Sequence, residues 1–157
     1  MYGRVEHVEQ LTPHMVRVVL GGEGLDGFAA GEFTDHYVKL AFPPRGAPYT
    51  VPFDAAEIRA TLPREQWPVQ RTYTVRSWDA GRLTIDFVVH GDTGVAGPWA
   101  RAARPGDLLT LRGRPGGAFR PDPAADWHLL AGDESALPAI ASSLARVPEG
   151  APVHVYI

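Results

Sequence analysis

Residues 71–76, Arg-Thr-Tyr-Thr-Val-Arg, place two cations and an aromatic ring on one short run that favours a β-strand. Guanidinium groups bind the paired oxygens of a pyrophosphate, and an aromatic face stacks on a flat ring system. A dinucleotide flavin has both of these parts, so we expect this run to contact FAD. For the run taken alone, the alternative is an ordinary packed strand with solvated arginines at its ends.

A second β-rich segment, residues 82–90, follows and opens into a glycine-rich loop. Gly97 suits the N-cap of a helix and Pro98 its first position, which predicts a short helix over residues 99–103. Free backbone N–H groups at a helix start attract anions. We therefore predict a phosphate site at residues 94–97, with a plain strand-to-helix turn as the alternative.

The composition is that of a water-soluble globular chain without a nucleic-acid-binding character. Of the 157 residues, 45% are hydrophobic, and 15 basic against 18 acidic residues give a net charge of −3. This balance favours neither nucleic acid nor an anionic membrane as a partner. The chain has no cysteine, which excludes disulfides and iron–sulfur ligation, and its six histidines form no i, i+4 pair, so we predict no metal site. We expect a cytoplasmic protein.

The elements that position these residues are mostly strands. Glycine and proline divide the first 120 residues into short β-rich pieces, which predicts six antiparallel strands that close into a Greek-key β-barrel. We expect these strands near residues 3–8, 14–20, 36–42, 71–78, 83–90 and 107–112. Between the third and fourth strands, Asp54 and Glu57 have capping-box spacing, which predicts a short surface helix.

The C-terminal part has a different pattern. An apolar run at residues 127–132, a helical segment at 135–147 and a second β-rich run at 153–157 predict a strand–helix–strand unit. We expect an FAD-binding β-barrel domain at residues 1–122 and, at residues 123–157, the N-terminal fragment of an NAD(P)H-binding α/β domain. In the turn at residues 132–135, the two carboxylates either hold the turn and the domain interface or cap the helix.

Four blocks of the chain, in order, resemble the siderophore-interacting proteins, the FAD-dependent ferric-siderophore reductases of the ferredoxin-reductase-like superfamily. The family pattern reads Arg-x-Tyr-Thr-x-Arg, Asp-Phe-Val-x-His-Gly, Gly-Pro-Ala-Ser-x-Trp-Ala and Ala-Gly-Asp-Glu-Ser/Thr-Ala-Leu-Pro-Ala-Ile. Residues 71–76, 86–91, 94–100 and 131–140 match these blocks. The loop departs from the pattern, because Val95 and Gly97 replace proline and serine, so a hydroxyl contact to phosphate is missing.

By this resemblance, Arg71 pairs with the FAD pyrophosphate, Tyr73 stacks on the isoalloxazine ring, and Thr74 contacts the ring near its N5 edge. Arg76 is the fourth candidate, although on a regular strand it points to the opposite side from Arg71. His90 is expected either to contact the flavin or to pack at the strand end. The full set of further candidate contacts is Val88, Val89, His90, Gly94, Val95, Ala96 and Gly97.

The resemblance implies a flavoprotein oxidoreductase in which NADPH or NADH reduces FAD and the flavin reduces the iron of a ferric siderophore, releasing Fe(II). Since siderophore contacts in this family lie largely in the second domain, we expect FAD binding more firmly than turnover by these 157 residues. Two other hypotheses stay open. One is a different ferredoxin-reductase-like flavin oxidoreductase, and the other is a β-barrel binding module without redox function.

Overall fold

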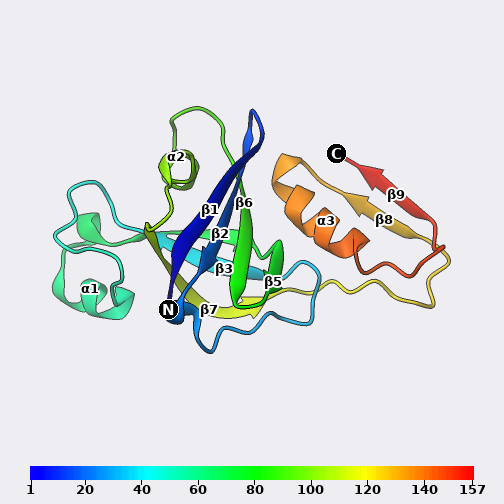
Figure 1. The fold of residues 1–157 in the computed structure, drawn as a ribbon, viewed down its shortest axis with the longest axis horizontal. Coiled ribbons are helices and arrows are strands. Elements are labelled where there is room, and N and C mark those ends of the chain that lie inside the picture. Colours follow the sequence, from blue (N-terminus) through cyan, green and yellow to red (C-terminus); the bar gives the residue numbers. More distant parts are fainter.

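The computed structural model of the chain describes residues 1–112 and 116–157. It has two parts, a curled β-sheet and a smaller strand–helix–strand unit that lies beside it and contains the C-terminus (Figure 1). A short segment after β7 connects them. In the described residues, no helix combines the length and the apolar character needed to cross a lipid bilayer.

Seven strands form the curled sheet, in the order β4-β3-β7-β1-β2-β6-β5. Every pair of neighbours is antiparallel. The strands are β1 (Tyr2–Thr12), β2 (Met15–Gly21), β3 (Tyr37–Phe42), β4 (Val69–Thr74), β5 (Ser77–Asp79), β6 (Arg82–Val88) and β7 (Leu108–Gly116).

The prediction of one strand over residues 71–78, and hence of six strands, is wrong. The run changes partner in its middle: the Val75 N–H donates to the His36 carbonyl beside β3 (2.8 Å), and the Arg76 N–H donates to the Thr84 carbonyl of β6 (2.9 Å). The chain therefore crosses from one edge of the sheet to the other at Val75–Arg76. This crossing splits the run into β4 and β5, the two edge strands of the curled sheet.

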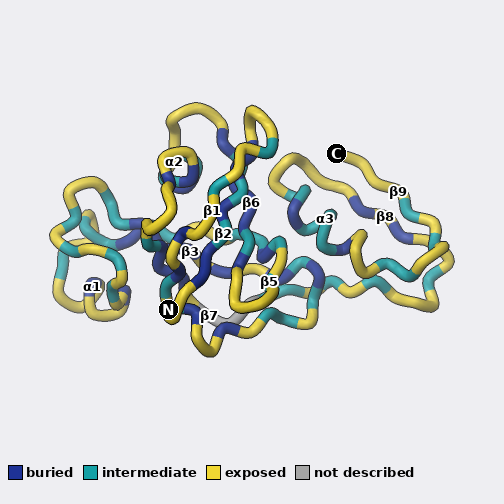
Figure 2. The backbone as a smooth tube through the Cα atoms, viewed as in Figure 1, coloured by how far each residue is buried: buried dark blue, intermediate teal, exposed yellow. Residues whose placement is uncertain are grey.

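The hydrophobic core lies inside the curl. Many of the core residues lie on β2, β3 and β6, and the largest of them are fully buried. Figure 2 shows the buried residues gathered in these strands. Helix α2 (Ala96–Ala102) covers one end of this core with Trp99, whose ring centroid lies 5.7 Å from those of both Phe42 and Phe87. Burial of such side chains stabilises the sheet by about 1.5–3 kcal/mol each.

Of the two predicted helix caps in this part, one is confirmed and the other is wrong. Asp54 is the N-cap of α1 (Ala55–Thr61), as predicted, and its carboxylate accepts from the N–H groups of Ala56 (2.7 Å) and Glu57 (3.4 Å). The predicted cap of α2 is wrong. Its N-cap is Val95 without a side-chain cap bond, so Pro98 is the third helical residue, where its missing N–H still costs no intrahelical bond. Single 3-10 turns, η1 (Glu23–Leu25) and η2 (Arg64–Gln66), complete this part.

The second part has the expected strand, helix and parallel strand. Strands β8 (His128–Ala131) and β9 (Val153–Tyr156) pair in parallel, and between them run η3 (Glu134–Ala136) and α3 (Leu137–Leu144). The helix ends earlier than the predicted residue 147. Its last turn tightens, with the Arg146 N–H donating to the Ser143 carbonyl (3.0 Å), and Pro148 follows.

Candidate functional site

A cavity of about 650 Å³ lies where the curled sheet meets the second part. This volume is within the range of small-molecule sites, roughly 300–1,000 Å³. Three segments form its wall: strand β4, the end of β6, and the turn that leads into α3. The lining residues are Arg71, Thr72, Tyr73, Thr74, Asp86, Val88, His90, Asp133, Glu134, Ser135 and Pro138.

The strand order explains why the cavity forms here. Strand β5 pairs with only the first residues of β6, from Arg82 to Thr84, so the later residues of β6 border the gap beside β4. On β4, Arg71 and Tyr73 pair with Leu40 and Val38 of β3, whose side chains belong to the core. Residues on one face of paired strands share a side. Arg71 and Tyr73 thus lie on the core side of an edge strand, where the sheet leaves that side partly open.

The core holds the ring of Tyr73 in place. Its centroid lies 4.5 Å from that of Phe87, with the ring planes inclined by 40°. Burial raises the pKa of the Tyr73 phenol above its ordinary value, and the charge of Arg71 opposes this only in part. The side chain is therefore an oriented, neutral phenol in the cavity wall.

Arg71 supplies an exposed cation to the same wall. Its Nη1 donates to the neighbouring Gln70 carbonyl (2.8 Å). A guanidinium has five N–H donors in a planar fork, so this one bond leaves it able to bind an anionic group with two oxygens.

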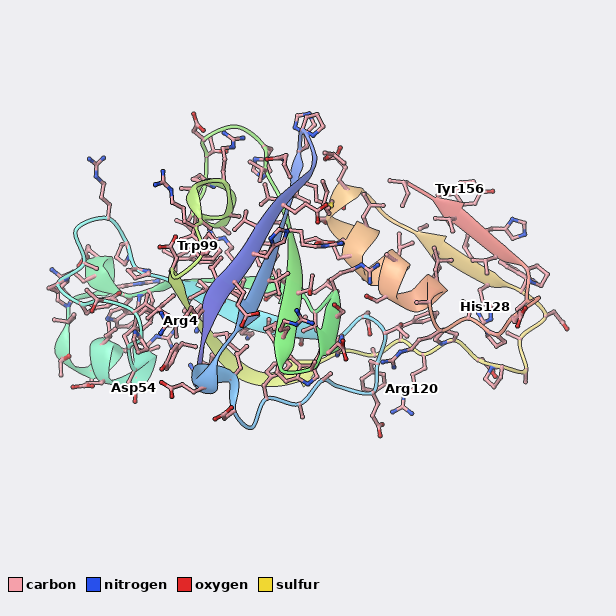
Figure 3. The ribbon with its side chains drawn as sticks, viewed as in Figure 1. Arg4, Asp54, Trp99, Arg120, His128 and Tyr156 are labelled. Carbon is pink, nitrogen blue, oxygen red and sulfur yellow. The ribbon has the colours of Figure 1, made fainter. Side chains whose placement is uncertain are left out.

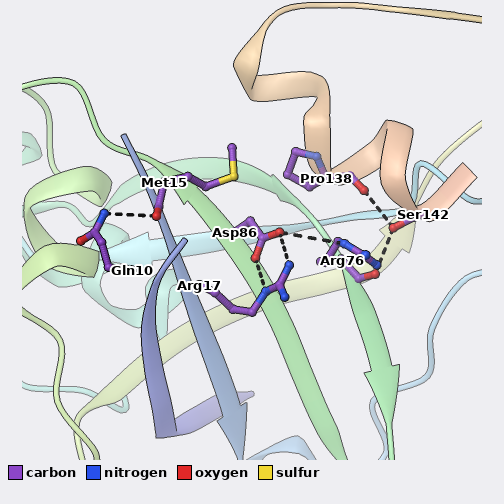
Figure 4. Close-up of polar contacts among 7 residues, drawn as sticks. All are labelled: Gln10, Met15, Arg17, Arg76, Asp86, Pro138 and Ser142. Atoms are coloured by element: carbon purple, nitrogen blue, oxygen red, sulfur yellow. Dashed lines mark hydrogen bonds and ion pairs between the residues drawn. The ribbon is translucent and has the colours of Figure 1, made fainter. Parts of the chain in front are cut away.

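Asp86 is a buried carboxylate in the wall, and arginines neutralise it. Arg17 Nε donates to Oδ1 (2.7 Å) and Arg17 Nη2 to Oδ2 (2.8 Å), while Arg76 Nε lies 4.0 Å from Oδ2 (Figure 4). The hydrogen bond to Asp86 raises the pKa of the Arg17 guanidinium, against the effect of burial. Because Arg17 binds both carboxylate oxygens, we assign Asp86 a structural role in the wall.

The turn before α3 brings two more carboxylates to the wall. Asp133 Oδ1 accepts from the Ser135 backbone N–H (2.9 Å) and from the Ser135 hydroxyl (2.6 Å), and these hydrogen bonds lower the pKa of Asp133. The interpretation of Asp133 as a cap is confirmed, since it is the N-cap of η3. Together with Glu134 it makes this end of the cavity acidic, opposite in charge to Arg71.

The structure brings together five of the predicted contact residues: Arg71, Tyr73, Thr74, Val88 and His90 all line the cavity. His90 is exposed, and its Nδ1 lies 3.5 Å from Thr93 Oγ1. Sequence reasoning missed Thr72, Asp86 and Pro138 as wall residues, although all three lie in motif blocks. These residues reach the cavity only through pairing and packing with distant segments, which no local sequence pattern indicates.

The other six predicted residues are not among the described lining residues of the cavity. Val89 is only 1% exposed as a whole residue and belongs to the core, and its N–H donates to the His14 carbonyl (2.8 Å), so it is not accessible to a ligand. The loop beyond β6 leads into α2, and a Cβ on Gly97 would approach the Val88 carbonyl to 3.4 Å. The six predicted residues that are not among the described lining residues are Arg76, Val89, Gly94, Val95, Ala96 and Gly97.

Two family models match the chain. Residues 4–119 match the siderophore-interacting FAD-binding domain, and residues 125–157 match the siderophore-interacting protein model. An uncharacterised protein of Mycobacterium tuberculosis is 51% identical over 148 residues, which are 90% of this chain and 51% of that protein. The ferric vibriobactin reductase ViuB of Vibrio cholerae is 40% identical over 94% of this chain and 54% of its own length. The chain thus spans about half the length of these relatives.

Solved structures show the same fold. A siderophore utilisation protein from T. fusca superposes with a TM-score of 0.80 at 37% identity, covering 99% of this chain and 59% of that one. A ferredoxin NADP+ reductase from Neisseria gonorrhoeae superposes with a TM-score of 0.64 at 16% identity, covering 99% of this chain and 56% of that one. The expected likeness to ferredoxin reductases is therefore confirmed at the level of the fold.

Proposed function

The chain belongs to the siderophore-interacting protein family, and from this premise we propose that it is the FAD-binding part of an NAD(P)H-dependent ferric-siderophore reductase. One observation carries the proposal. The cavity joins the exposed cation of Arg71 to the oriented ring of Tyr73 within the segment that matches the FAD-binding domain. A flavin dinucleotide needs a partner for its phosphates and a surface for its flat ring, so the wall fits this cofactor.

The cavity wall suggests how the chain holds FAD. Arg71 binds the pyrophosphate, and Tyr73 stacks on the isoalloxazine ring with Phe87 supporting it from behind. Thr74 and His90 border the ring edge. The acidic end at Asp133 and Glu134 repels phosphate, so it favours the orientation that puts the pyrophosphate near Arg71.

Further contacts extend the proposed site beyond the cavity wall. Val88, in the wall itself, lines the ring or the ribose, and beyond the wall residues 94–97 bring backbone N–H groups toward the phosphates. Gly94 has φ +79°, a conformation that favours glycine, and it keeps the loop free of a side chain at this point.

When bound, FAD supplies the conversion of a two-electron hydride donor into single electrons for ferric iron. The residues of this chain bind and orient it, and none of them needs to transfer a proton. ViuB is named a ferric vibriobactin reductase, and a relative in Escherichia coli, 42% identical over 87% of this chain and 52% of its own length, is named an NADPH-dependent ferric-chelate reductase. These names support a ferric siderophore as the substrate and NADPH as the donor, and NADH is the alternative donor within the proposal.

Titration of the purified chain with FAD tests the proposal. We expect saturable binding, seen as quenching of flavin fluorescence. Arg71→Ala should weaken binding about tenfold or more, because it removes a charge-assisted contact, and salt should weaken binding less in this variant than in the wild type. Arg82→Ala is the matched control, since Arg82 is also exposed but lies outside the cavity wall. A wild-type chain that takes up no FAD would contradict the proposal.

The reductase step needs its own measurement. FAD-loaded protein is mixed with NADPH or NADH and a ferric hydroxamate chelate, and Fe(II) is followed with a ferrous-specific dye. Formation of Fe(II) that requires both the nucleotide and FAD is the expected result. Tight FAD binding without Fe(II) formation would limit the proposal to cofactor binding.

A further inference from the structure

Arg76 connects the two parts of the molecule. Although it is the second arginine of the Arg-x-Tyr-Thr-x-Arg motif, it is not among the described residues that line the cavity. Its side chain lies beside Asp86 of β6, with Nε 4.0 Å from Oδ2. Its carbonyl oxygen accepts a hydrogen bond from Ser142 Oγ of α3 (3.0 Å), as Figure 4 shows.

The β6 side of this connection is firmly held. The side chain of Asp86 is only 4% exposed, and Arg17 binds both of its oxygens. A carboxylate removed from water is stabilised by a second guanidinium nearby. The backbone N–H of Arg76 also donates to the Thr84 carbonyl. Arg76 is therefore attached to β6 through both its main chain and its side chain.

The α3 side of the connection leads to the cavity. Ser142 lies one helical turn after Pro138, and its hydroxyl is also within 2.9 Å of the Pro138 carbonyl. Pro138 and residues 133–135 line the cavity. A single helical turn is short and stiff, so the position of Ser142 determines where Pro138 and the acidic turn lie.

We propose that Arg76 is a positioning residue that fastens α3 to β6 and so holds the acidic turn at the cavity, and that it does not bind the FAD phosphates. The role rests on the proposed function, because its consequence is the shape and charge of the flavin cavity. The two arginines of the motif then have different roles: the first faces the ligand, whereas the second lies beside Asp86 of β6 and its main-chain carbonyl accepts from Ser142 of α3.

Hydrogen exchange of the FAD-free protein tests the attachment directly. Arg76→Met removes the guanidinium but keeps much of the aliphatic stem, and Ser142→Ala removes the hydroxyl that binds the Arg76 carbonyl. Each should speed exchange of the α3 backbone amides about fivefold, the size expected from one lost polar contact, with β1 and β2 unchanged. Arg76→Lys keeps the charge beside Asp86 and should largely restore the wild-type rate. Arg101→Met, which breaks the exposed pair with Asp92, is the control and should leave α3 unchanged.

FAD titration separates positioning from phosphate binding. If Arg76 positions α3, Arg76→Met should lower FAD affinity less than threefold, keep the wild-type salt dependence and alter the visible band of the bound flavin. A phosphate ligand would instead lose about tenfold or more in affinity and part of the salt dependence, with unchanged exchange in α3. That second pattern overturns the inference.

The two proposals fail in different ways. A wild-type chain that does not bind FAD contradicts the proposed function, whereas the exchange measurement, which uses no FAD, still decides whether Arg76 fastens α3. Unchanged α3 exchange in both Arg76→Met and Ser142→Ala overturns the inference, whatever the FAD titration shows.

Discussion

The curled sheet and the strand–helix–strand unit bury their apolar side chains to very different extents. Leu83 and Phe87 in the sheet are 0% exposed, whereas Trp127, Leu129 and Tyr156 in the second unit are 55%, 52% and 65% exposed. In Figure 2 the interior of the sheet is largely buried, whereas β9 is mostly exposed and β8 alternates between buried and exposed residues. The sheet is held by its own core, so the second unit depends more on how it is fastened to the sheet.

Several polar contacts contribute to that fastening; Figure 3 shows the side chains of both parts, with Arg120 labelled on the segment that connects them. Thr34 Oγ1 and Ser143 Oγ lie 2.8 Å apart in a buried position, and Arg146 Nη1 donates to the Glu32 carbonyl (3.2 Å). Asp35 Oδ1 accepts from the N–H groups of Ala118 and Phe119, both at 2.9 Å, and so holds the connecting segment. Four predictions test how buried and exposed contacts differ in the two parts and at their junction, from the largest expected effect to the smallest.

A leucine-to-alanine substitution should lower the free energy of unfolding by very different amounts in the two parts. Leu83→Ala removes a fully buried side chain from the sheet and should lower the free energy of unfolding by about 2–5 kcal/mol. Leu129→Ala removes a half-exposed side chain from β8 and should change it by no more than about 0.5 kcal/mol. Urea unfolding followed by tryptophan fluorescence measures both. Equal losses of unfolding free energy would contradict the inferred difference in burial between the two parts.

Buried and exposed ion pairs should differ in the same way. Asp86→Ala leaves the guanidinium of Arg17 without its carboxylate and should cost about 3 kcal/mol of unfolding free energy, the low end for a buried pair because Arg17 is partly exposed. Asp92→Ala breaks the exposed pair with Arg101 and should cost less than about 1 kcal/mol. Urea unfolding at low and high salt measures both costs. A large, salt-sensitive loss for Asp92→Ala would contradict the assignment.

A double-mutant cycle isolates the junction itself. Thr34→Val leaves the Ser143 hydroxyl buried without its partner and should destabilise the docking of α3 by about 2 kcal/mol. Adding Ser143→Ala removes the unpaired group, so the double variant should recover most of this loss. Hydrogen exchange of α3 provides the measurement. If the two effects simply add, the hydroxyls do not act as a pair.

Acid should weaken the protein through His36. This side chain is 5% exposed, and burial lowers its pKa, with the charge of Arg146 adding to the effect and the Val75 hydrogen bond and Asp35 opposing it. In the unfolded chain, histidine titrates near pH 6.5, so as the pH falls below about 6.5 the unfolded state binds a proton before the folded state does. Stability should therefore fall between about pH 6.5 and the lower pKa of the folded protein, and level off below it.

His36→Gln is the variant that tests this pH dependence. Urea unfolding at about pH 7.5 and about pH 5.5 should show a smaller difference for the variant than for the wild type, because the titrating group is gone. Equal pH dependence in the two proteins would assign the effect to other groups.

Local patterns predicted local structure well. The capping-box spacing located α1, since Asp54 needs only the next three residues to act as a cap. Glycine and proline punctuation and β-rich composition located most strands to within a few residues, because these signals lie within or beside one strand. The start of α2 was misplaced because Gly97 and Pro98 suit a cap in isolation, whereas packing beside β6 extends the helix back to Ala96.

The local sequence patterns did not predict contacts between distant segments. The run at residues 71–78 has uninterrupted β character, and nothing in it marks the point at which its partner changes from His36 to Thr84. The pair of Arg17 and Asp86 joins residues 69 positions apart, so its geometry depends on the pairing of β2 with β6.

By itself, the sequence determined the family, the strand character of most segments and the side chains that a flavin site needs, because these depend on residue type and on spacing over a few positions. Only the tertiary structure decided that Arg71 and Tyr73 share a cavity with the acidic turn, and that the Arg76 side chain lies beside Asp86 while its carbonyl meets α3. The physical reason is that a cavity wall is made by backbone pairing and packing between segments far apart in the chain, and a local sequence pattern does not specify which distant segments meet.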